Sequence, residues 1–323
     1  MSEELILVIQ EGTGIKEYCL NSYYDFMVRL PNHHSNVKFY GKGHNPGGGW
    51  GEHVITTYRP NKTIHDIIRE DLNGVEPDVI FMYNPEIATS DFTSLKSKVY
   101  AVLTDVPTMN MALFNHILKH NVTYEALFYN FLFENKTYQN WFDNGVSKCK
   151  EFIYWPAFTS HIYDMNIEKD IDFFLSGRVS PEYSHRKFYR EVLNGSGLNY
   201  IDNLGGPTTT TNDTYRNTLA RSKFILHDGG INNRMVGKYF EAPLCGGVLI
   251  SPDMGEGFTS AGFVDQENIV IIDRGVNIKD TRNILKELIE GNEWDRLSKN
   301  ANKLVRERHT TDMRIKDLLK IIL

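Results

Sequence analysis

The stretch that most constrains the fold is residues 221–251, where two apolar runs flank a glycine turn and a polar segment. The first run, Phe224 to Leu226, is followed after two residues by Gly229 and Gly230. The polar segment has the spacing of a helix, and the second apolar run, Val248 to Ile250, closes the stretch. This order predicts a strand, a glycine turn, a helix and a second strand, as in a parallel α/β sheet.

Three charged residues of the polar segment share one face of the predicted helix. Arg234, Lys238 and Glu241 fall at i, i+4 and i+7, close to the expected helix start. Two cations beside the positive end of a helix suit a phosphate group, and the carboxylate can accept hydrogen bonds from two sugar hydroxyls. These groups together indicate a nucleoside diphosphate. The alternative is a solvated helix face with ordinary charge pairs, but the position after a strand and two glycines favours a ligand.

The same segment resembles a known family of enzymes. Asn233 to Ile250, with Glu241 followed by Ala242 and with Cys245 before two glycines, resembles the donor-site motif of group 1 glycosyltransferases of the GT-B fold. The closest variety is the branch that includes the spore-maturation protein CgeB. The resemblance runs from about Tyr154 to the end of the chain.

The resemblance implies an α/β protein of two Rossmann-like domains that face each other across a cleft. It implies that Glu241 binds the ribose of a nucleotide sugar and that Arg234 and Lys238 hold the diphosphate. Asn233 stands where many members have a further glutamate, so a sugar contact from that position is in doubt.

The rest of the chain repeats the rhythm of strands and helices. The predicted strands cover residues 5–9, 37–40, 79–83, 99–103, 151–155, 171–175, 198–201, 224–226, 248–250 and 269–272. The predicted helices cover 15–30, which Pro31 should end, 63–72 with a capping box, 109–120, 135–142, 185–193, 211–220, 276–290, 294–308 and 312–323. We expect an acceptor-side domain over 1–158, a nucleotide-sugar domain over 159–308, and a C-terminal helix at 309–323 that packs back on the first domain.

Composition narrows the class of partner. The chain has 35 Lys and Arg residues and 41 Asp and Glu residues, which gives a net charge of -6. This charge argues against non-specific binding to nucleic acid and favours a small or neutral acceptor. The three cysteines, Cys19, Cys149 and Cys245, lack metal-type spacing and are expected to be reduced thiols. No segment is apolar for long enough to span a membrane, and the acidic start is unlike a secretory signal, so we expect a cytoplasmic protein.

A short glycine turn follows the first predicted strand. Gly12, Thr13 and Gly14 can bring backbone amides close to an acceptor or a phosphate group. A plain tight turn explains the same residues, because two glycines alone are a weak signal.

A second loop on the acceptor side is unusually rich in glycine. Residues 41–51 hold six glycines, and the loop also carries His44, Trp50 and Glu52. These side chains can supply a stacking surface and proton acceptors for an acceptor molecule. The loop is therefore either a binding lid or an ordinary surface loop.

Asp105 is the candidate catalytic base, with His44 as a second candidate. Asp105 follows the apolar run 99–103, so it is expected at the carboxyl end of a central strand, where α/β enzymes place catalytic groups. A carboxylate or histidine there can remove the proton of the acceptor hydroxyl. The alternative is that Asp105 only begins a turn and caps the following helix.

Three further features of the second half can be interpreted from the sequence. Gly177 and Arg178 follow the strand predicted at 171–175, and they face the donor phosphates if they are not a surface turn. The predicted helix 185–193 carries Arg186 on a basic face that we expect to be solvated. Residues 252–258 form another glycine-rich loop, which can wrap the base or sugar.

The predicted reaction is transfer of a sugar from a nucleotide diphosphate sugar, UDP- or GDP-linked, to a glycan or other hydroxyl acceptor. No cofactor or metal is expected, because the one Asp-x-Asp pattern, Asp170 to Asp172, lies at the start of a strand and so at the wrong end for the cleft. The cations and helix amides would then stabilise the leaving diphosphate. Three rivals stay open: a phage-type glycosyltransferase of DNA bases, a non-catalytic nucleotide-sugar binding protein, and an epimerase of the GT-B fold.

Overall fold

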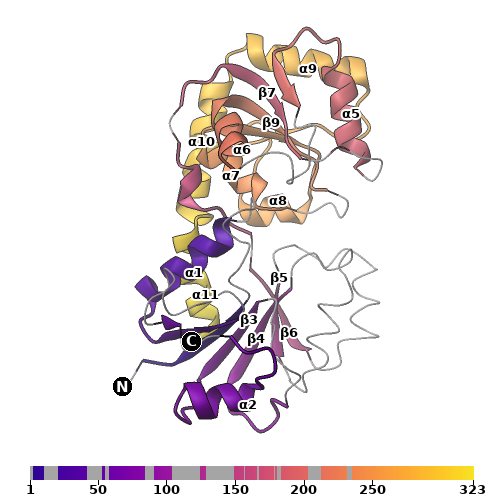
Figure 1. The fold of residues 1–323 in the computed structure, drawn as a ribbon. Helices are drawn as coiled ribbons and strands as arrows, with labels where there is room; N and C mark the ends of the chain where they lie inside the picture. Colours follow the sequence, from indigo (N-terminus) through magenta and orange to yellow (C-terminus); the bar gives the residue numbers. More distant parts are fainter. Residues whose placement is uncertain are drawn as a thin grey trace. The chain divides into compact units, whose positions relative to one another are not determined.

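The structure is a computed structural model that describes residues 3–10, 21–41, 53–54, 58–83, 91–103, 124–128, 149–155, 157–165, 167–177, 179, 183–202, 212–230 and 235–323. The chain divides into two compact units, each built around a parallel sheet (Figure 1). The first unit comprises Met1–Lys16, Tyr23–Pro156 and Arg314–Leu323, and the second comprises Glu17–Ser22 and Ala157–Met313. Two parallel sheets with helices define the predicted α/β class, which is confirmed.

The sheet of the first unit has six strands in the order β2-β1-β3-β4-β5-β6. The strands are β1 (Ile6–Gln10), β2 (Val37–Tyr40), β3 (Val79–Tyr83), β4 (Lys98–Leu103), β5 (Tyr124–Phe128) and β6 (Cys149–Tyr154). Neighbouring strands are parallel throughout. Ile6 to Ile9 are fully buried, because a central parallel strand is covered on both faces.

Helix α1 (Asn21–His33) corrects one sequence prediction. The prediction ended this helix at Pro31, but the helix contains Pro31 and runs on to His33. A proline removes one amide donor, which is a small loss in the last turn, and the amide of His34 still donates to the carbonyl of Leu30 at 3.0 Å. The ring of Phe26 in α1 packs edge to face on Trp155, with 5.7 Å between ring centroids.

The capping box predicted at Thr63 is confirmed. It opens α2 (Ile64–Asp66), which continues as a π-helix, η2 (Ile67–Asp71). The amide of Asp66 donates to the Thr63 hydroxyl oxygen, and the Asp66 carboxylate accepts from the Thr63 amide at 3.0 Å. The Thr63 amide, followed by the Thr63 hydroxyl, donates to the Asp66 carboxylate, and these two hydrogen bonds lower the pKa of Asp66 to about 2.

The sheet of the second unit has five strands in the order β11-β10-β9-β7-β8. The strands are β7 (Ile171–Leu175), β8 (Tyr200–Asp202), β9 (Ser222–Leu226), β10 (Val248–Ser251) and β11 (Val270–Ile271). The helices are η3 (His161–Tyr163), α5 (Ser184–Leu193), α6 (Asn212–Arg221), α7 (Lys238–Leu244), α8 (Glu256–Ala261), α9 (Ile278–Glu290) and α10 (Trp294–Arg308). From β7 the chain moves to β8 on one side and then to β9, β10 and β11 on the other. The strand order therefore reverses between β7 and β9.

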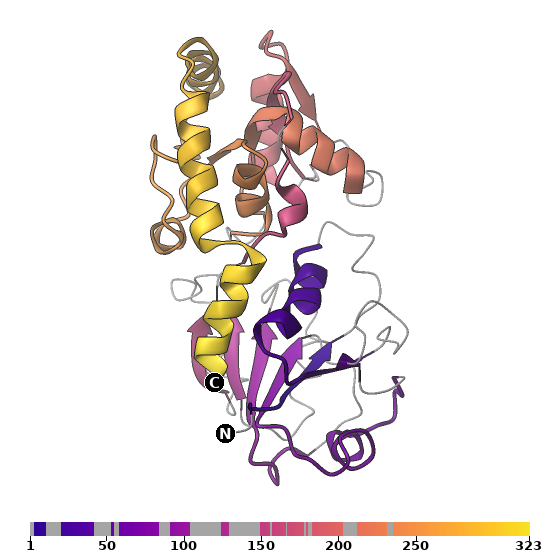
Figure 2. The ribbon, with the colours of Figure 1, turned by 90° about the vertical axis from the view of Figure 1, so that its left-hand side faces the viewer.

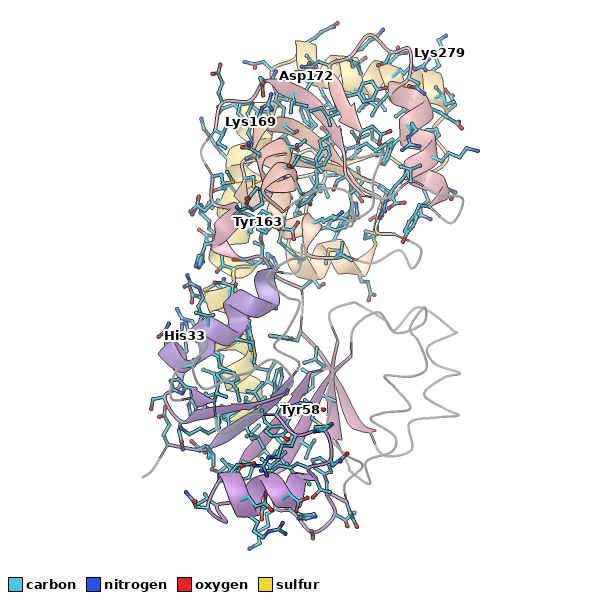
Figure 3. The ribbon with its side chains drawn as sticks, viewed as in Figure 1. His33, Tyr58, Tyr163, Lys169, Asp172 and Lys279 are labelled. Carbon is cyan, nitrogen blue, oxygen red and sulfur yellow. The ribbon has the colours of Figure 1, made fainter. Side chains whose placement is uncertain are left out.

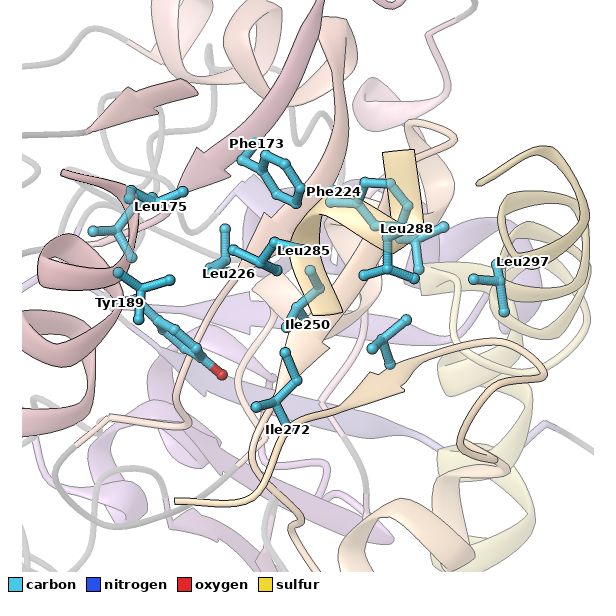
Figure 4. Close-up of a cluster of buried hydrophobic side chains, with 14 residues drawn as sticks. Phe173, Leu175, Tyr189, Phe224, Leu226, Ile250, Ile272, Leu285, Leu288 and Leu297 are labelled. Carbon is cyan, nitrogen blue, oxygen red and sulfur yellow. The ribbon is translucent and has the colours of Figure 1, made fainter. Parts of the chain in front are cut away.

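The core of the second unit lies between its sheet and the helices α5 and α9. Alternate residues of β7 and β9 point into it, with Phe173 stacked on Phe224 at 5.6 Å between ring centroids (Figure 4). Tyr189 of α5 and Leu285 of α9 pack on these strands from the helix side. Burial of this face positions the carboxyl ends of β7 and β9 side by side.

The last helix, α11 (Thr311–Ile322), is shared between the units, since Arg314–Leu323 belongs to the first one. Within the first unit the Tyr100 hydroxyl donates to the carbonyl of Ile321 at 3.3 Å, and Trp155 Nε1 donates to the carbonyl of Arg314 at 3.2 Å. Figure 2 shows α11 directly after α10 in the chain.

Candidate functional site

The candidate site is the carboxyl edge of the second sheet, where the strand order reverses. Residues that follow β7 and β9 lie side by side there, because Leu175 and Leu226 are partners in the ladder and the amide of Ser176 donates to the carbonyl of Leu226 at 3.1 Å. Open α/β sheets bind their ligands at such a reversal, outside the carboxyl ends of the strands. The predicted residues Gly177, Gly229 and Gly230 all lie in these two turns, and each has a positive φ.

A buried ion pair joins the two turns to α5. Arg186 Nε donates to Asp228 Oδ1 at 2.7 Å, and both residues are almost fully buried. The amide of Gly230 donates to the same oxygen at 2.9 Å. At Gly177, φ is 108° and a Cβ would lie 2.7 Å from Arg186 Nη1, so only glycine leaves room for the guanidinium. The prediction that Arg186 lies on a solvated face was wrong, because its guanidinium is buried in an ion pair with Asp228.

His227 is held in one tautomer at this edge. Its Nδ1 lies 3.2 Å from the carbonyl oxygen of Ser176, and a carbonyl only accepts hydrogen bonds, so Nδ1 carries the proton and Nε2 is an acceptor. Burial, followed by the charges of Arg186 and Lys238, keeps the pKa of His227 well below its usual range. The imidazole is therefore neutral at pH 7.

Several buried polar atoms at this edge are left unsatisfied. Among the described residues, the atoms without a hydrogen-bond partner include Ser176 Oγ, His185 Nε2, Tyr189 Oη and His227 Nε2. Buried polar atoms in folded proteins are nearly always paired. Their concentration here distinguishes this edge as a place for a polar ligand.

Helix α7 carries two of the predicted donor-binding residues, but not as the predicted stripe. The helix begins at Lys238, after three non-helical residues from 235 to 237, so Arg234 precedes it. Lys238 and Glu241 share the first turn at i and i+3. The helix is seven residues long, so its dipole is short, and the predicted contribution of helix amides is correspondingly weak.

Glu241 is a buried carboxylate with one defined partner. It is 3% exposed, and its Oε2 accepts a hydrogen bond from the Tyr215 hydroxyl at 2.9 Å. Burial raises the pKa of Glu241 to about 7, against the opposing effects of Lys238 and of the Tyr215 hydrogen bond. A strongly perturbed carboxyl group beside a strand reversal is typical of a functional site.

The structure describes five of the predicted site residues, and these lie at or beside one edge: Gly177, Gly229, Gly230, Lys238 and Glu241. The other predicted residues lie outside the described ones: Arg178, Arg234, Asp105, His44, Gly12, Thr13, Gly14, Trp50 and Glu52. Sequence reasoning missed Tyr215, Arg186, His227 and Asp228 as parts of the site. The last two had a usable signal, because polar residues directly after a buried strand reach its carboxyl edge.

The Asp-x-Asp pattern lies at the start of β7, at the opposite, amino end of the sheet, as predicted. Asp170 is paired with Arg221, and Asp172, labelled in Figure 3, is paired with Lys223 at 2.8 Å. Neither carboxylate lies at the carboxyl edge. Within the described part of the chain, no group of three or more His, Cys, Asp or Glu residues could hold a metal ion.

Two cavities lie away from the carboxyl edge of the second sheet. One, of about 510 Å³, is lined by Glu76, Asp78 and Lys96 among others and lies at the amino ends of β3 and β4. The other, of about 400 Å³, is lined by residues that include Gly246 and Arg306. In these cavities Asp78, Glu76 and Arg306 are engaged by protein partners, whereas the carboxyl edge of the second sheet carries buried polar atoms without one, and the candidate site is therefore assigned to that edge.

A comparison with known protein families matches the second half of the chain. Residues 171–320, a little under half of the chain, match the family described as Glycosyl transferase-like. The matched range contains both turns, α5, α6 and α7. No curated protein matches the sequence, and no helix among the described residues is long and apolar enough to cross a membrane.

The whole chain is similar in fold to solved glycosyltransferases. A glycosyltransferase from Rickettsia africae has a TM-score of 0.61 at 9% identity, and the match covers 100% of this chain and 98% of that one. Anabaena HepE in complex with UDP and glucose has a TM-score of 0.60 at 11% identity, with 98% and 99% covered. An α-glucosyltransferase in complex with UDP-glucose and DNA containing an abasic site has a TM-score of 0.58 at 12% identity, with 99% and 100% covered.

These findings define the class of protein. The fold is that of GT-B glycosyltransferases, as predicted, and the second half of the chain carries a glycosyltransferase-like domain. The prediction of a glycosyltransferase is therefore confirmed as a class of protein, without its donor or acceptor.

Proposed function

We propose that this protein transfers a sugar from a nucleoside diphosphate sugar to a hydroxyl acceptor, and that it holds the nucleotide at the carboxyl edge of the second sheet. The observation that carries the proposal is the buried carboxylate of Glu241, one helical turn from Lys238 and beside the reversal of strand order. A carboxylate that accepts from two ribose hydroxyls and a cation near the diphosphate are what a nucleotide sugar requires.

The proposed chemistry depends on charge that develops on the leaving nucleoside diphosphate. Lys238, together with Arg178 and Arg234, would stabilise this charge, and no divalent metal would be needed. Asp105 or His44 would take the proton of the acceptor hydroxyl. Activity that disappears with EDTA and returns with Mn²⁺ would show that the metal-independent form of the proposal is wrong.

We propose UDP or GDP as the nucleotide, with UDP first because two proteins of similar fold are described with UDP or UDP-glucose. The acceptor would be a glycan or another small hydroxyl compound, since the net charge of -6 argues against a nucleic acid. The motif around Glu241 supports a place in the CgeB-like branch. The free thiol of Cys245 supports the cytoplasm as the compartment.

Thermal unfolding with UDP, GDP, TDP, ADP and CMP tests the donor site. A ligand at one hundred times its Kd should stabilise the fold by about 2.7 kcal/mol. We expect one nucleotide to raise the Tm of the wild type, and the Glu241→Gln variant to lose most of that shift. An Asp170→Asn variant, changed at the amino end of the same sheet, should keep it. If no nucleotide changes the Tm, the proposed donor site is wrong.

Turnover separates the remaining alternatives. A transferase should consume the matching nucleotide sugar and release the free nucleoside diphosphate in the presence of acceptor sugars. Nucleotide binding without any turnover would indicate a non-catalytic binding protein. Conversion of the sugar without release of nucleotide would indicate an epimerase. Tight binding to duplex DNA with a steep dependence on salt would indicate a DNA-modifying enzyme.

A further inference from the structure

The carboxylate of Glu241 has two oxygens in different surroundings. Its Oε2 is engaged by the Tyr215 hydroxyl at 2.9 Å, which among the described residues is the one hydrogen-bond donor to this carboxylate. Its Oε1 would lie 3.2 Å from a Cβ at residue 237, where the chain has glycine. Gly237 therefore leaves space beside the oxygen that no described donor engages. One oxygen is held, and the other is open to a further donor.

Tyr215 is itself fixed by packing on several sides. It lies in α6 and is 2% exposed, and its ring packs on Phe174 of β7 and on Tyr163 of η3, with centroids 6.1 and 6.5 Å apart. The ammonium of Lys238 lies 5.3 Å from the centroid of the same ring. Because the ring cannot rotate out of this packing, its hydroxyl reaches Glu241 from a constant direction.

A carboxylate that must accept from two vicinal hydroxyls has to present a defined orientation to them. Burial alone does not supply one, since a carboxyl group can rotate about its last torsion, which is broad and roughly two-fold. A fixed donor on one oxygen removes that freedom and directs the other oxygen. Tyr215 is the described group that does this for Glu241.

We infer that Tyr215 is a positioning residue for the donor site: its hydroxyl holds Oε2 of Glu241 so that Oε1 accepts from the ribose hydroxyls of the nucleotide. The inference rests on the proposed function and adds a residue that reaches the ribose only through Glu241. It assigns discrimination between ribose and deoxyribose to the pair of Tyr215 and Glu241. A merely structural tyrosine would affect both sugars equally.

The test combines a minimal change in the protein with a minimal change in the ligand. Tyr215→Phe keeps the ring, its packing and the ring face toward Lys238, and removes only the hydroxyl. The control is Tyr200→Phe, which removes a tyrosine hydroxyl bonded at the same distance, 2.9 Å, to Asn194 in another part of the second unit. Isothermal titration calorimetry gives the Kd of each full-length variant for UDP and for 2′-deoxyUDP, or for GDP and 2′-deoxyGDP if thermal unfolding selects GDP.

We expect the wild type to bind the ribonucleotide about tenfold more tightly than the deoxynucleotide. The reason is that the loss of one hydrogen bond to a charged group typically weakens binding by about a factor of ten or more. The Tyr215→Phe substitution should raise the Kd for the ribonucleotide about tenfold and the Kd for the deoxynucleotide less than about twofold. Tyr200→Phe should match the wild type with both. Circular dichroism verifies that each variant is folded.

Three outcomes would overturn the inference while the donor site stands. If Tyr215→Phe changes neither Kd, or weakens the binding of both nucleotides equally, the hydroxyl does not act through the ribose. Equal binding of the two nucleotides by the wild type would overturn it as well. A wild type that binds neither nucleotide would instead contradict the proposed function, and the inference with it.

Discussion

The two ends of the second sheet use their charged residues in different ways. At the amino end, Asp170 and Arg221 form a pair whose side chains are 52% and 42% exposed. At the carboxyl end, Arg186 and Asp228 form a pair whose side chains are 8% and 3% exposed. Exposed pairs contribute little to stability, whereas a buried pair makes each partner depend on the other. The charged pair at the amino end is solvated, whereas the carboxyl end carries buried charge that a ligand site can use.

The largest expected effect breaks the buried pair. Asp228→Ala leaves the guanidinium of Arg186 buried without its carboxylate, so the free energy of unfolding should fall by about 3–5 kcal/mol. Chemical denaturation at pH 7 measures this change. The matched change at the amino end, Asp170→Ala, should have no measurable effect, because its pair is solvated. Equal effects at both ends would remove the distinction between them.

The second prediction concerns the pH dependence of stability. The pKa of Glu241 is raised from 4.5 to about 7, so the folded state keeps a proton that the unfolded state has lost between these values. Stability from this group is present below pH 4.5 and is lost as pH rises towards 7, by about 3 kcal/mol in total. Urea denaturation from pH 5 to 8 should show this slope in the wild type.

Glu241→Gln removes the titrating group and keeps its size. Relative to this variant, the wild type should lose stability as pH rises through 7. Parallel stability curves for the two proteins would show that Glu241 does not titrate with a raised pKa.

The strands were predictable because their signal is local. The predicted ranges of β2, β3 and β7 match these strands residue for residue, because each strand is a short, mainly buried apolar run, interrupted only by Lys38 in β2 and Asp172 in β7. Helix α7 was predicted less well. It starts only at Lys238, and it contains Pro243. Both features depend on how α7 packs against α10 and β10, which the periodicity of the sequence does not indicate.

The predicted site was incomplete for a different reason. Glu241 and Lys238 could be identified from a motif within one segment, but their surroundings come from distant parts of the chain. Tyr215 lies 26 positions from Glu241, and Arg186 lies 42 positions from Asp228. Such partners are set by the strand order, which brings α5 and α6 to the same edge, and no spacing rule along the sequence relates them.

The third prediction compares two glycines of positive φ. Gly177→Ala places a Cβ 2.7 Å from Arg186 Nη1 at a φ of 108°, so it should lower the free energy of unfolding by about 2–3 kcal/mol. Gly195→Ala has a φ of 67° and no atom within 4 Å of the new Cβ, so only the strain of about 1 kcal/mol is expected. Chemical denaturation of both variants measures the difference. If Gly195→Ala lowers the free energy of unfolding by as much as Gly177→Ala, close packing on Arg186 does not explain the effect at Gly177.

The smallest expected effect is at the amino end, where Asp172 is bound to Lys223 at 2.8 Å with both side chains partly exposed. Asp172→Asn keeps the size of the side chain and removes one surface ion pair, so stability should change by less than about 1 kcal/mol. Nucleotide binding and turnover should equal those of the wild type, with or without EDTA, because the parallel strands place this carboxylate at the end of the sheet opposite to Glu241. If Asp172→Asn lost turnover and Mn²⁺ restored it, the catalytic site would lie at the amino end of the second sheet and not at the carboxyl end.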